Sequence, residues 1–178
     1  MQRNRQPTAK RNAPRSGVVV LELILATPAF LIIMLAIVEI SLIYVAIEQT
    51  AYASRYAAKI ASETPGGSIN ALNTGPLKTS VDRVLNTGGL PLGSCRVILE
   101  HNVSVPTTIN DPVVAAPNCD CTPPVTSLPV VAGSVTTESV RTTVCVPLDG
   151  NIPDFLSSFG FSIQNYVVEE STTFSYEL

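Results

Sequence analysis

The chain has 178 residues, of which 46% are hydrophobic and 14% are charged, with a formal net charge of −3. Ordinary soluble domains carry about 25% charged residues, so this chain is too apolar to be disordered. The acidic balance argues against nucleic acid as a partner. One histidine, His101, and few charged side chains argue against a polar catalytic centre and a small-molecule substrate.

Charge is unevenly distributed near the start of the chain. Residues 1–17 hold five basic side chains and no acidic one: Arg3, Arg5, Lys10, Arg11 and Arg15. An apolar run from Val18 to Val38 follows, which only Glu22 and the Thr27-Pro28 pair interrupt. A helix of this length covers about 31 Å, close to the hydrocarbon thickness of a bilayer. The pattern predicts a basic leader, 1–17, and a membrane span, 18–40.

The charge step also predicts an orientation. The positive-inside rule places the basic side in the cytoplasm and everything after about Ile47 across the membrane. A cleaved secretory signal peptide is the alternative, but its apolar core is expected to run for about 7 to 15 residues. Here apolar character continues almost unbroken to Ile47. We therefore expect an exported domain behind an N-terminal anchor helix.

Glu22 places a carboxylate inside the apolar run. An ionisable side chain within a span is costly, which makes it a functional hypothesis that needs a partner. Cleavage after Gly17 would give Val18 a free ammonium, four residues before Glu22 on one helical face. Glu22 could pair with this ammonium or with that of a neighbouring subunit. The alternative is a carboxylate that extends to the cytoplasmic interface of an uncleaved anchor.

The stretch GVVVLELILATP at residues 17–28, IVEI at 37–40 and AYASRYA at 51–57 together resemble the TadE-like family of the tight-adherence (Tad) pilus system. The resemblance implies a minor pilin or pseudopilin whose leader prepilin peptidase removes between Gly17 and Val18. It implies a single-pass protein of the bacterial inner membrane with a periplasmic domain, possible incorporation into a cell-surface pilus, and a role in cell adhesion. The implied partners are the peptidase, other pilin subunits, and the assembly platform and ATPase.

Two other classes of function stay open. The chain could be an uncleaved single-pass anchor that displays a periplasmic binding module. It could also be a membrane-tethered enzyme, which would require His101, Glu100 and Asp111 to meet in one pocket, although His101 is more simply a surface or edge histidine. We expect a protein that is not an enzyme and has no cofactor or metal.

The anchor helix is predicted to continue to residue 63, because 41–63 is rich in alanine, lacks Gly and Pro, and stops at TPGG, 64–67. Pro28 removes one backbone donor and predicts a bend between Ile24 and Pro28. Glu39 is interpreted either as a packing group or as a marker of the outer interface.

The later half of this helix has two faces of interest. Tyr52 and Tyr56 lie four residues apart, and we expect their face to cover the globular domain; recognition of another pilus subunit is the alternative. Arg55 and Lys59, also four residues apart, are expected to form a solvated face.

Residues 64–178 predict a small periplasmic domain. Pro76 to Asn86 has a helical apolar stripe of Leu77, Val81, Val84 and Leu85. Three stretches rich in Val, Thr, Ile and Tyr predict strands: Arg96–Val105, Val135–Val146 and Ile163–Tyr176. The expected fold is α+β, with a long pilin-like N-terminal helix followed by an antiparallel sheet of three or more strands.

Two connecting segments have distinct compositions. Residues 106–133 contain six prolines, which argue against a central strand and predict a long surface loop. In residues 147–160, Phe155, Leu156 and Phe159 have the spacing of one helical turn that docks apolar side chains on the core.

All four cysteines, Cys95, Cys119, Cys121 and Cys145, fall on the exported side, where disulfides are the default. A Cys119–Cys121 bridge would close a very tight ring. Two arrangements remain, each joining one of these two cysteines to Cys95 and the other to Cys145. The alternatives are a four-cysteine zinc site, for which the Cys-x-Cys spacing is too short, and a redox-active thiol pair, for which it is one residue short.

Overall fold

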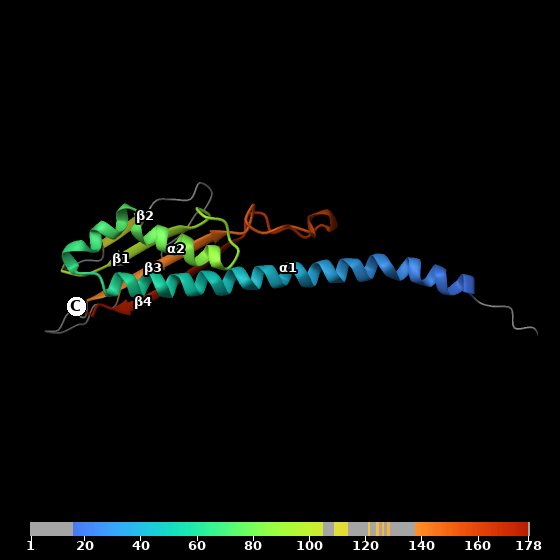
Figure 1. The fold of residues 1–178 in the computed structure, drawn as a ribbon, viewed down its shortest axis with the longest axis horizontal. Coiled ribbons are helices and arrows are strands. Elements are labelled where there is room, and N and C mark those ends of the chain that lie inside the picture. The colour runs from blue at the N-terminus through green and yellow to red at the C-terminus, as the bar shows by residue number, and fades with distance from the viewer. Residues whose placement is uncertain are drawn as a thin grey trace, which may run out of the picture.

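The structure, a computed structural model, describes residues 16–104, 109–113, 121, 124, 126, 128 and 138–177. Figure 1 shows one long, gently curved helix whose C-terminal half carries a small domain. The helix, α1, runs from Ser16 to Ser62 and contains Pro28. A 3-10 helix, Gly66–Thr74, and a second α-helix, α2 (Pro76–Thr87), follow it. The predicted anchor helix is therefore confirmed as one continuous element, while the leader up to residue 15 lies outside the described residues.

Four strands form one antiparallel sheet in the described part of the chain: β1 (Arg96–His101), β2 (Ile109–Val113), β3 (Ser139–Pro147) and β4 (Val167–Ser175). Their order is β2-β1-β3-β4, so β1 and β3 are central. The α+β class and the three predicted strands are confirmed. The expectation of a loop over 106–133 is wrong at β2, which is an edge strand and not the central strand that the prolines argue against. An edge strand tolerates Pro112. Most of that loop lies outside the described residues.

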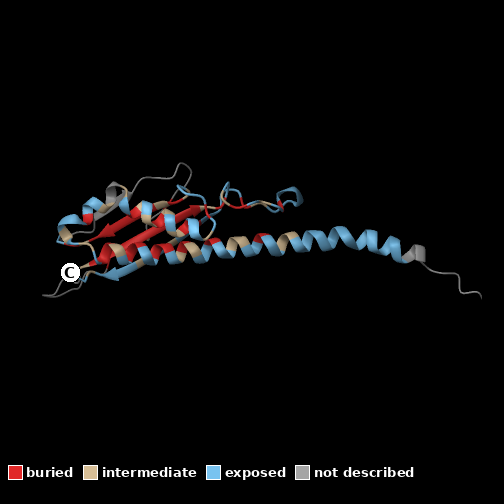
Figure 2. Cartoon of the chain, viewed as in Figure 1, coloured by how far each residue is buried: buried red, intermediate tan, exposed pale blue. Residues whose placement is uncertain are grey.

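Both α-helices cover the same face of the sheet. Alternate residues of the central strands point to this face and are fully buried, including Val97 and Leu99 on β1 and Val140 and Val144 on β3. From α2, the predicted stripe supplies Leu77, Val81 and Leu85, all with 0% exposure, whereas Val84 is half-buried. Figure 2 shows buried residues along the strands of the sheet and on parts of the helices beside it.

Small side chains let α1 lie close against β3 and β4. Its buried stripe consists of Ala46, Thr50, Ala53, Ser54, Ala57, Ala58, Ala61 and Ser62. Two hydrogen bonds fix the position of the helix on the sheet. The hydroxyl of Thr142 donates to the Ser54 carbonyl at 2.8 Å, and the hydroxyls of Ser54 and Thr172 lie 2.8 Å apart. The half of α1 after about residue 41 is therefore part of the domain.

Candidate assembly interface

The N-terminal half of α1 extends beyond the domain and has almost no partner within the described residues. Its apolar side chains are largely exposed, for example Val19 at 63%, Leu23 at 66% and Leu25 at 71%. Figure 2 shows this half as an almost continuously exposed rod. By length and composition, α1 is the one helix in the described part of the chain that could cross a membrane. A helix this apolar needs either lipid or other apolar helices around it.

The polar side chains in this segment differ in whether they form a hydrogen bond to the helix backbone. Glu22 is exposed on the helix, and the surroundings of Gly17 and Val18 are not described by the structure, so the predicted pairing of Glu22 stays a prediction. The hydroxyls of Thr27 and Ser41 donate to the carbonyls four residues earlier, both at 2.7 Å. Such bonds satisfy hydroxyl groups inside an apolar span. The helix continues through Pro28, and the bend expected there also stays a prediction.

Glu39 is fully buried, with 0% exposure, at the point where α1 leaves the domain. One carboxylate oxygen, Oε2, accepts hydrogen bonds from the backbone N–H groups of Phe155 and Leu156, both at 3.0 Å. These two residues lie more than a hundred positions later in the chain, so no local pattern signals this contact. The interpretation of Glu39 as a packing group is thus confirmed, and its place relative to the outer interface stays a prediction.

The segment that Glu39 binds buries fewer side chains than predicted. It contains one 3-10 turn, Ser157–Phe159. Leu156 packs inward at 8% exposure, whereas Phe155 and Phe159 are 40% and 58% exposed. The expectation that all three side chains dock on the core is therefore correct only for Leu156.

The prediction that the face of α1 with Tyr52 and Tyr56 covers the globular domain is wrong. Tyr52 and Tyr56 are 59% and 40% exposed, because the small residues of the opposite stripe are the ones that face the sheet. Hollows of about 360 Å³ and 560 Å³ flank the two tyrosines, one toward α2 and one toward the end of β4. The solvated face is confirmed: Arg55 and Lys59 are exposed, and Lys59 pairs with Glu63 at 3.7 Å.

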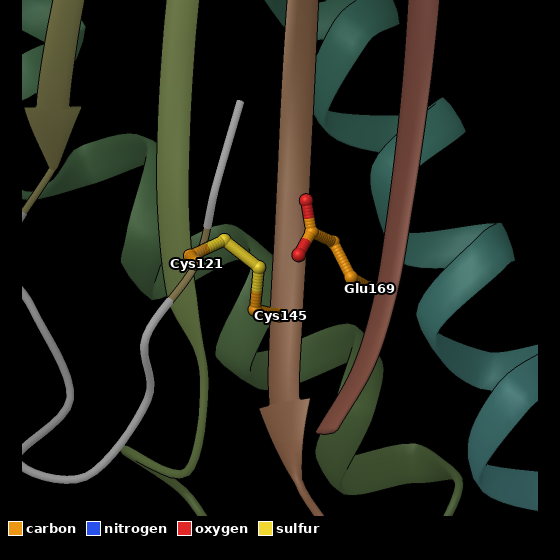
Figure 3. A group of neighbouring side chains, drawn as sticks. All are labelled: Cys121, Cys145 and Glu169. Carbon is orange, nitrogen blue, oxygen red and sulfur yellow. A yellow bond between two sulfur atoms is a disulfide. The ribbon is translucent and has the colours of Figure 1, made fainter. Parts of the chain in front are cut away.

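On the second face of the sheet, Cys121 lies against the central strands. A disulfide joins Cys121 to Cys145, and both cysteines pack against Ile98. In Figure 3 the Glu169 carboxylate lies beside this disulfide, and one ligand atom from each of these three residues lies within 4.8 Å of the others. A disulfide offers no thiolate, and thiolates are the sulfur ligands that zinc binds. The group therefore has the geometry but not the chemistry of a metal site.

The predicted disulfide of Cys95 is wrong. Cys95 is a free, buried thiol whose sulfur lies 3.1 Å from Oδ1 of Asp82 on α2. Burial, followed by the hydrogen bond to Asp82, raises the pKa of this thiol. The physical reason is strand alternation, because Cys95 points to the helix face of the sheet and Cys145 to the other face. Cys119 lies outside the described residues.

Ionisable residues of the central strands form a buried pair. Arg141 on β3 donates to both carboxylate oxygens of Glu100 on β1, with an Nη2–Oε1 distance of 3.0 Å. Arg141 Nη1 also donates to the carbonyl of Thr126 at 2.6 Å, and Nη2 to that of Pro124 at 3.5 Å. This guanidinium therefore holds the backbone of Pro124 and Thr126 against the sheet.

His101 lies on the opposite face from Glu100. It is buried, with 1% exposure, and its Nε2 lies 3.0 Å from Oδ1 of Asn70. The expectation of a surface or edge histidine is thus wrong, since β1 is a central strand. The Asp111 side chain lies outside the described residues. Glu100 and His101 do not meet in one pocket, as the enzyme alternative would require.

Comparison with known proteins gives one match. The model of the TadE-like protein family matches residues 17–59, which confirms the resemblance seen in the sequence. The match begins at Gly17 and covers the exposed segment of α1 together with most of the segment on the sheet. Neither a curated protein nor a solved structure matches the chain.

Proposed function

We propose that this protein is a minor pilin or pseudopilin of a Tad-type pilus and that it has a structural rather than an enzymatic role. Prepilin peptidase cleaves it after Gly17, and residues 18–40 of α1 then hold it in the bacterial inner membrane. The N-terminus faces the cytoplasm and the domain lies in the periplasm. During assembly the helix passes from the lipid into a bundle of like helices in the pilus.

The exposed N-terminal half of α1 is the observation that carries this proposal. The described part of the domain does not cover its apolar side chains, so they require an apolar environment. Lipid and a bundle of apolar helices both provide one, and the helix can therefore pass from the first to the second. The TadE-like match over residues 17–59 covers this segment and begins at the proposed cleavage glycine.

Glu22 is the group that sets the register in this proposal. Cleavage gives Val18 an ammonium, and a carboxylate four residues later is tolerated in an apolar bundle when it is paired. Pairing with the ammonium of the neighbouring subunit would fix how far one helix slides along the next. Assembly also requires the partners that the family resemblance implies, namely the other pilin subunits, the assembly platform and its ATPase.

Intact mass measurement of protein purified from cells that contain prepilin peptidase tests the proposal. The expected chain begins at Val18. Replacing Gly17 by leucine should leave the full-length chain in the membrane. The matched substitution Ser16→Leu lies outside the cleaved bond, so a larger fraction of this variant should be cleaved. A chain that still begins at Met1 in the unmodified protein would contradict the proposal.

An uncleaved anchor with a periplasmic binding module is the second candidate. The exposed tyrosines and the two hollows beside them favour it, because exposed aromatic side chains next to concave surfaces are typical of binding sites. Retention of residues 1–17 in functional protein would select this candidate over the pilin.

A further inference from the structure

A second apolar feature lies beside the end of the exposed helix. The segment Pro153–Phe161, here called the Phe loop, extends from β3 past the end of the sheet and runs alongside α1 (Figure 1). The Glu39 carboxylate binds its backbone at Phe155 and Leu156. On α1, Leu35 and Ala36 are half-buried, whereas the residues before them are exposed. The Phe loop is therefore fixed to the helix at its exit from the domain.

The Phe loop exposes aromatic side chains and no charge. Phe155, Phe159 and Phe161 are 40%, 58% and 51% exposed, and they are three of the five phenylalanines in the chain. Residues 155–168 contain no charged side chain. Asp154, the one charged residue of the Phe loop, has its carboxylate turned back into the loop, where it accepts hydrogen bonds from the Ser162 hydroxyl at 2.9 Å and the Ile163 N–H at 3.2 Å.

Five backbone N–H groups of the Phe loop are hydrogen-bonded without water. The Glu39 carboxylate accepts hydrogen bonds from two of them, those of Phe155 and Leu156. The N–H groups of Phe159 and Phe161 donate to the Leu156 carbonyl at 2.8 and 3.3 Å, and that of Gly160 donates to the Ser157 carbonyl at 3.1 Å. In an apolar surrounding each unsatisfied donor is costly, so internal bonding of this kind permits a loop to leave water.

The position of Glu39 along α1 sets the depth of the loop. Twenty residues of helix separate Val19 from Glu39, which at 1.5 Å per residue is about 30 Å, the thickness of the hydrocarbon core. If Val19 lies at the inner boundary, Glu39 lies at the outer one. The exposed phenylalanines are then at the level of the boundary between headgroups and acyl chains, into which apolar surfaces that carry Trp, Phe or Leu insert.

We propose that the Phe loop inserts into the outer leaflet of the membrane that α1 spans, where it acts as a second, interfacial anchor. This inference rests on the proposed membrane span. Because the loop and the helix are joined at Glu39, the two anchors together fix the tilt of the domain on the membrane surface. A second copy of the chain covering the loop is the competing occupant.

Single tryptophan probes test the proposal, because the chain contains no tryptophan. The full chain is reconstituted in vesicles of phosphatidylethanolamine and phosphatidylglycerol that carry a quencher at a known acyl-chain depth. The probe is Phe159→Trp in the Phe loop. Phe30→Trp, in the proposed span, is the positive control, and Phe174→Trp, on β4, is the matched control on the domain.

The expected result has three parts. Phe159→Trp emits at shorter wavelength than Phe174→Trp, is quenched by lipids with a shallow quencher, and is protected from aqueous iodide. Phe30→Trp is quenched by lipids with a deep quencher. The additional change Glu39→Leu removes the carboxylate acceptor and reduces the lipid quenching of Phe159→Trp, whereas Glu39→Gln, which keeps an acceptor, reduces it less.

Two results would overturn the inference. If iodide quenches Phe159→Trp while lipids quench Phe30→Trp, the span stands and the loop lies in water. If neither lipid nor iodide quenches Phe159→Trp, protein covers the loop. Failure of lipids to quench Phe30→Trp would instead refute the membrane span of the proposed function, so the two failures are distinguishable.

Discussion

Cys95 and Cys145 lie at the ends of two paired strands but on opposite faces of the sheet. Arg96, the residue after Cys95, is the register partner of Cys145. Side chains alternate between the faces of a strand, so the thiol of Cys95 points toward α2, whereas the sulfur of Cys145 points to the other face, where it is bonded to Cys121. The sheet itself therefore prevents a bridge between them.

Cysteine labelling tests this arrangement. Cys95 should resist alkylation in the folded chain, because it is buried and its pKa is raised, and should react once the protein is denatured. Peptide mapping without reduction should recover Cys121 joined to Cys145. A disulfide-linked peptide that contains Cys95 would contradict the structure.

The same thiol predicts a pH dependence of stability. Burial and the hydrogen bond to Asp82 raise its folded pKa above the ordinary 9.0, and Lys78 opposes the shift. As the pH rises above 9.0, the unfolded thiol loses its proton while the folded thiol retains it, so the free energy of unfolding should fall.

Urea unfolding of the detergent-solubilised chain at pH 8 to 11 would measure this loss. Cys95→Ser, which keeps a donor for Asp82 but does not titrate in this range, should show a smaller decrease. Equal pH dependence of the two proteins would show that Cys95 does not contribute.

The buried Arg141–Glu100 pair predicts strongly non-additive mutations. Replacing Arg141 by methionine leaves the Glu100 carboxylate buried without its cation, which should lower the free energy of unfolding by about 3 to 5 kcal/mol. The double variant Arg141→Met, Glu100→Leu should lose less than this single variant, because no buried charge is left. A double-mutant cycle from urea unfolding measures the difference, and additive losses would argue against direct coupling.

Glu39 predicts a specific stability effect. Glu39→Leu deprives the Phe155 and Leu156 N–H groups of their acceptor, and burying such a donor unpaired costs about 1 to 3 kcal/mol. Hydrogen exchange of these two amides, followed by mass spectrometry, should accelerate, while amides of β3 keep their protection. Glu39→Gln is the matched control, since its amide oxygen can still accept. Unchanged exchange in Glu39→Leu would show that the contact does not hold the loop.

Glu22 predicts a defect in assembly without a defect in insertion. Glu22→Leu makes the span more apolar, so membrane fractionation should find it inserted as before. Without the carboxylate, the Val18 ammonium of the neighbouring subunit has no partner in the bundle, so incorporation into pili should fall. Glu22→Asp keeps the negative charge and should be incorporated into pili more efficiently than Glu22→Leu. Normal incorporation of Glu22→Leu into purified pili would contradict the pairing.

The sequence by itself determined those features that depend on neighbouring residues in the chain. The apolar run and its basic leader marked the anchor helix, helical spacing marked α2, and stretches rich in Val, Thr, Ile and Tyr marked β1, β3 and β4. These patterns are local because a helix or strand repeats its orientation every few residues. The family resemblance lay in the same N-terminal segment, which the match over residues 17–59 confirmed.

Only the tertiary structure decided which distant residues meet. The free state of Cys95 and the Cys121–Cys145 bridge follow from the faces of a folded sheet. The burial of Glu39 depends on a loop 117 residues away, and the exposure of Tyr52 depends on which stripe of α1 packs on β3 and β4. Such contacts bring together segments whose separation in the chain leaves no periodic trace, so they are set by packing of the whole domain.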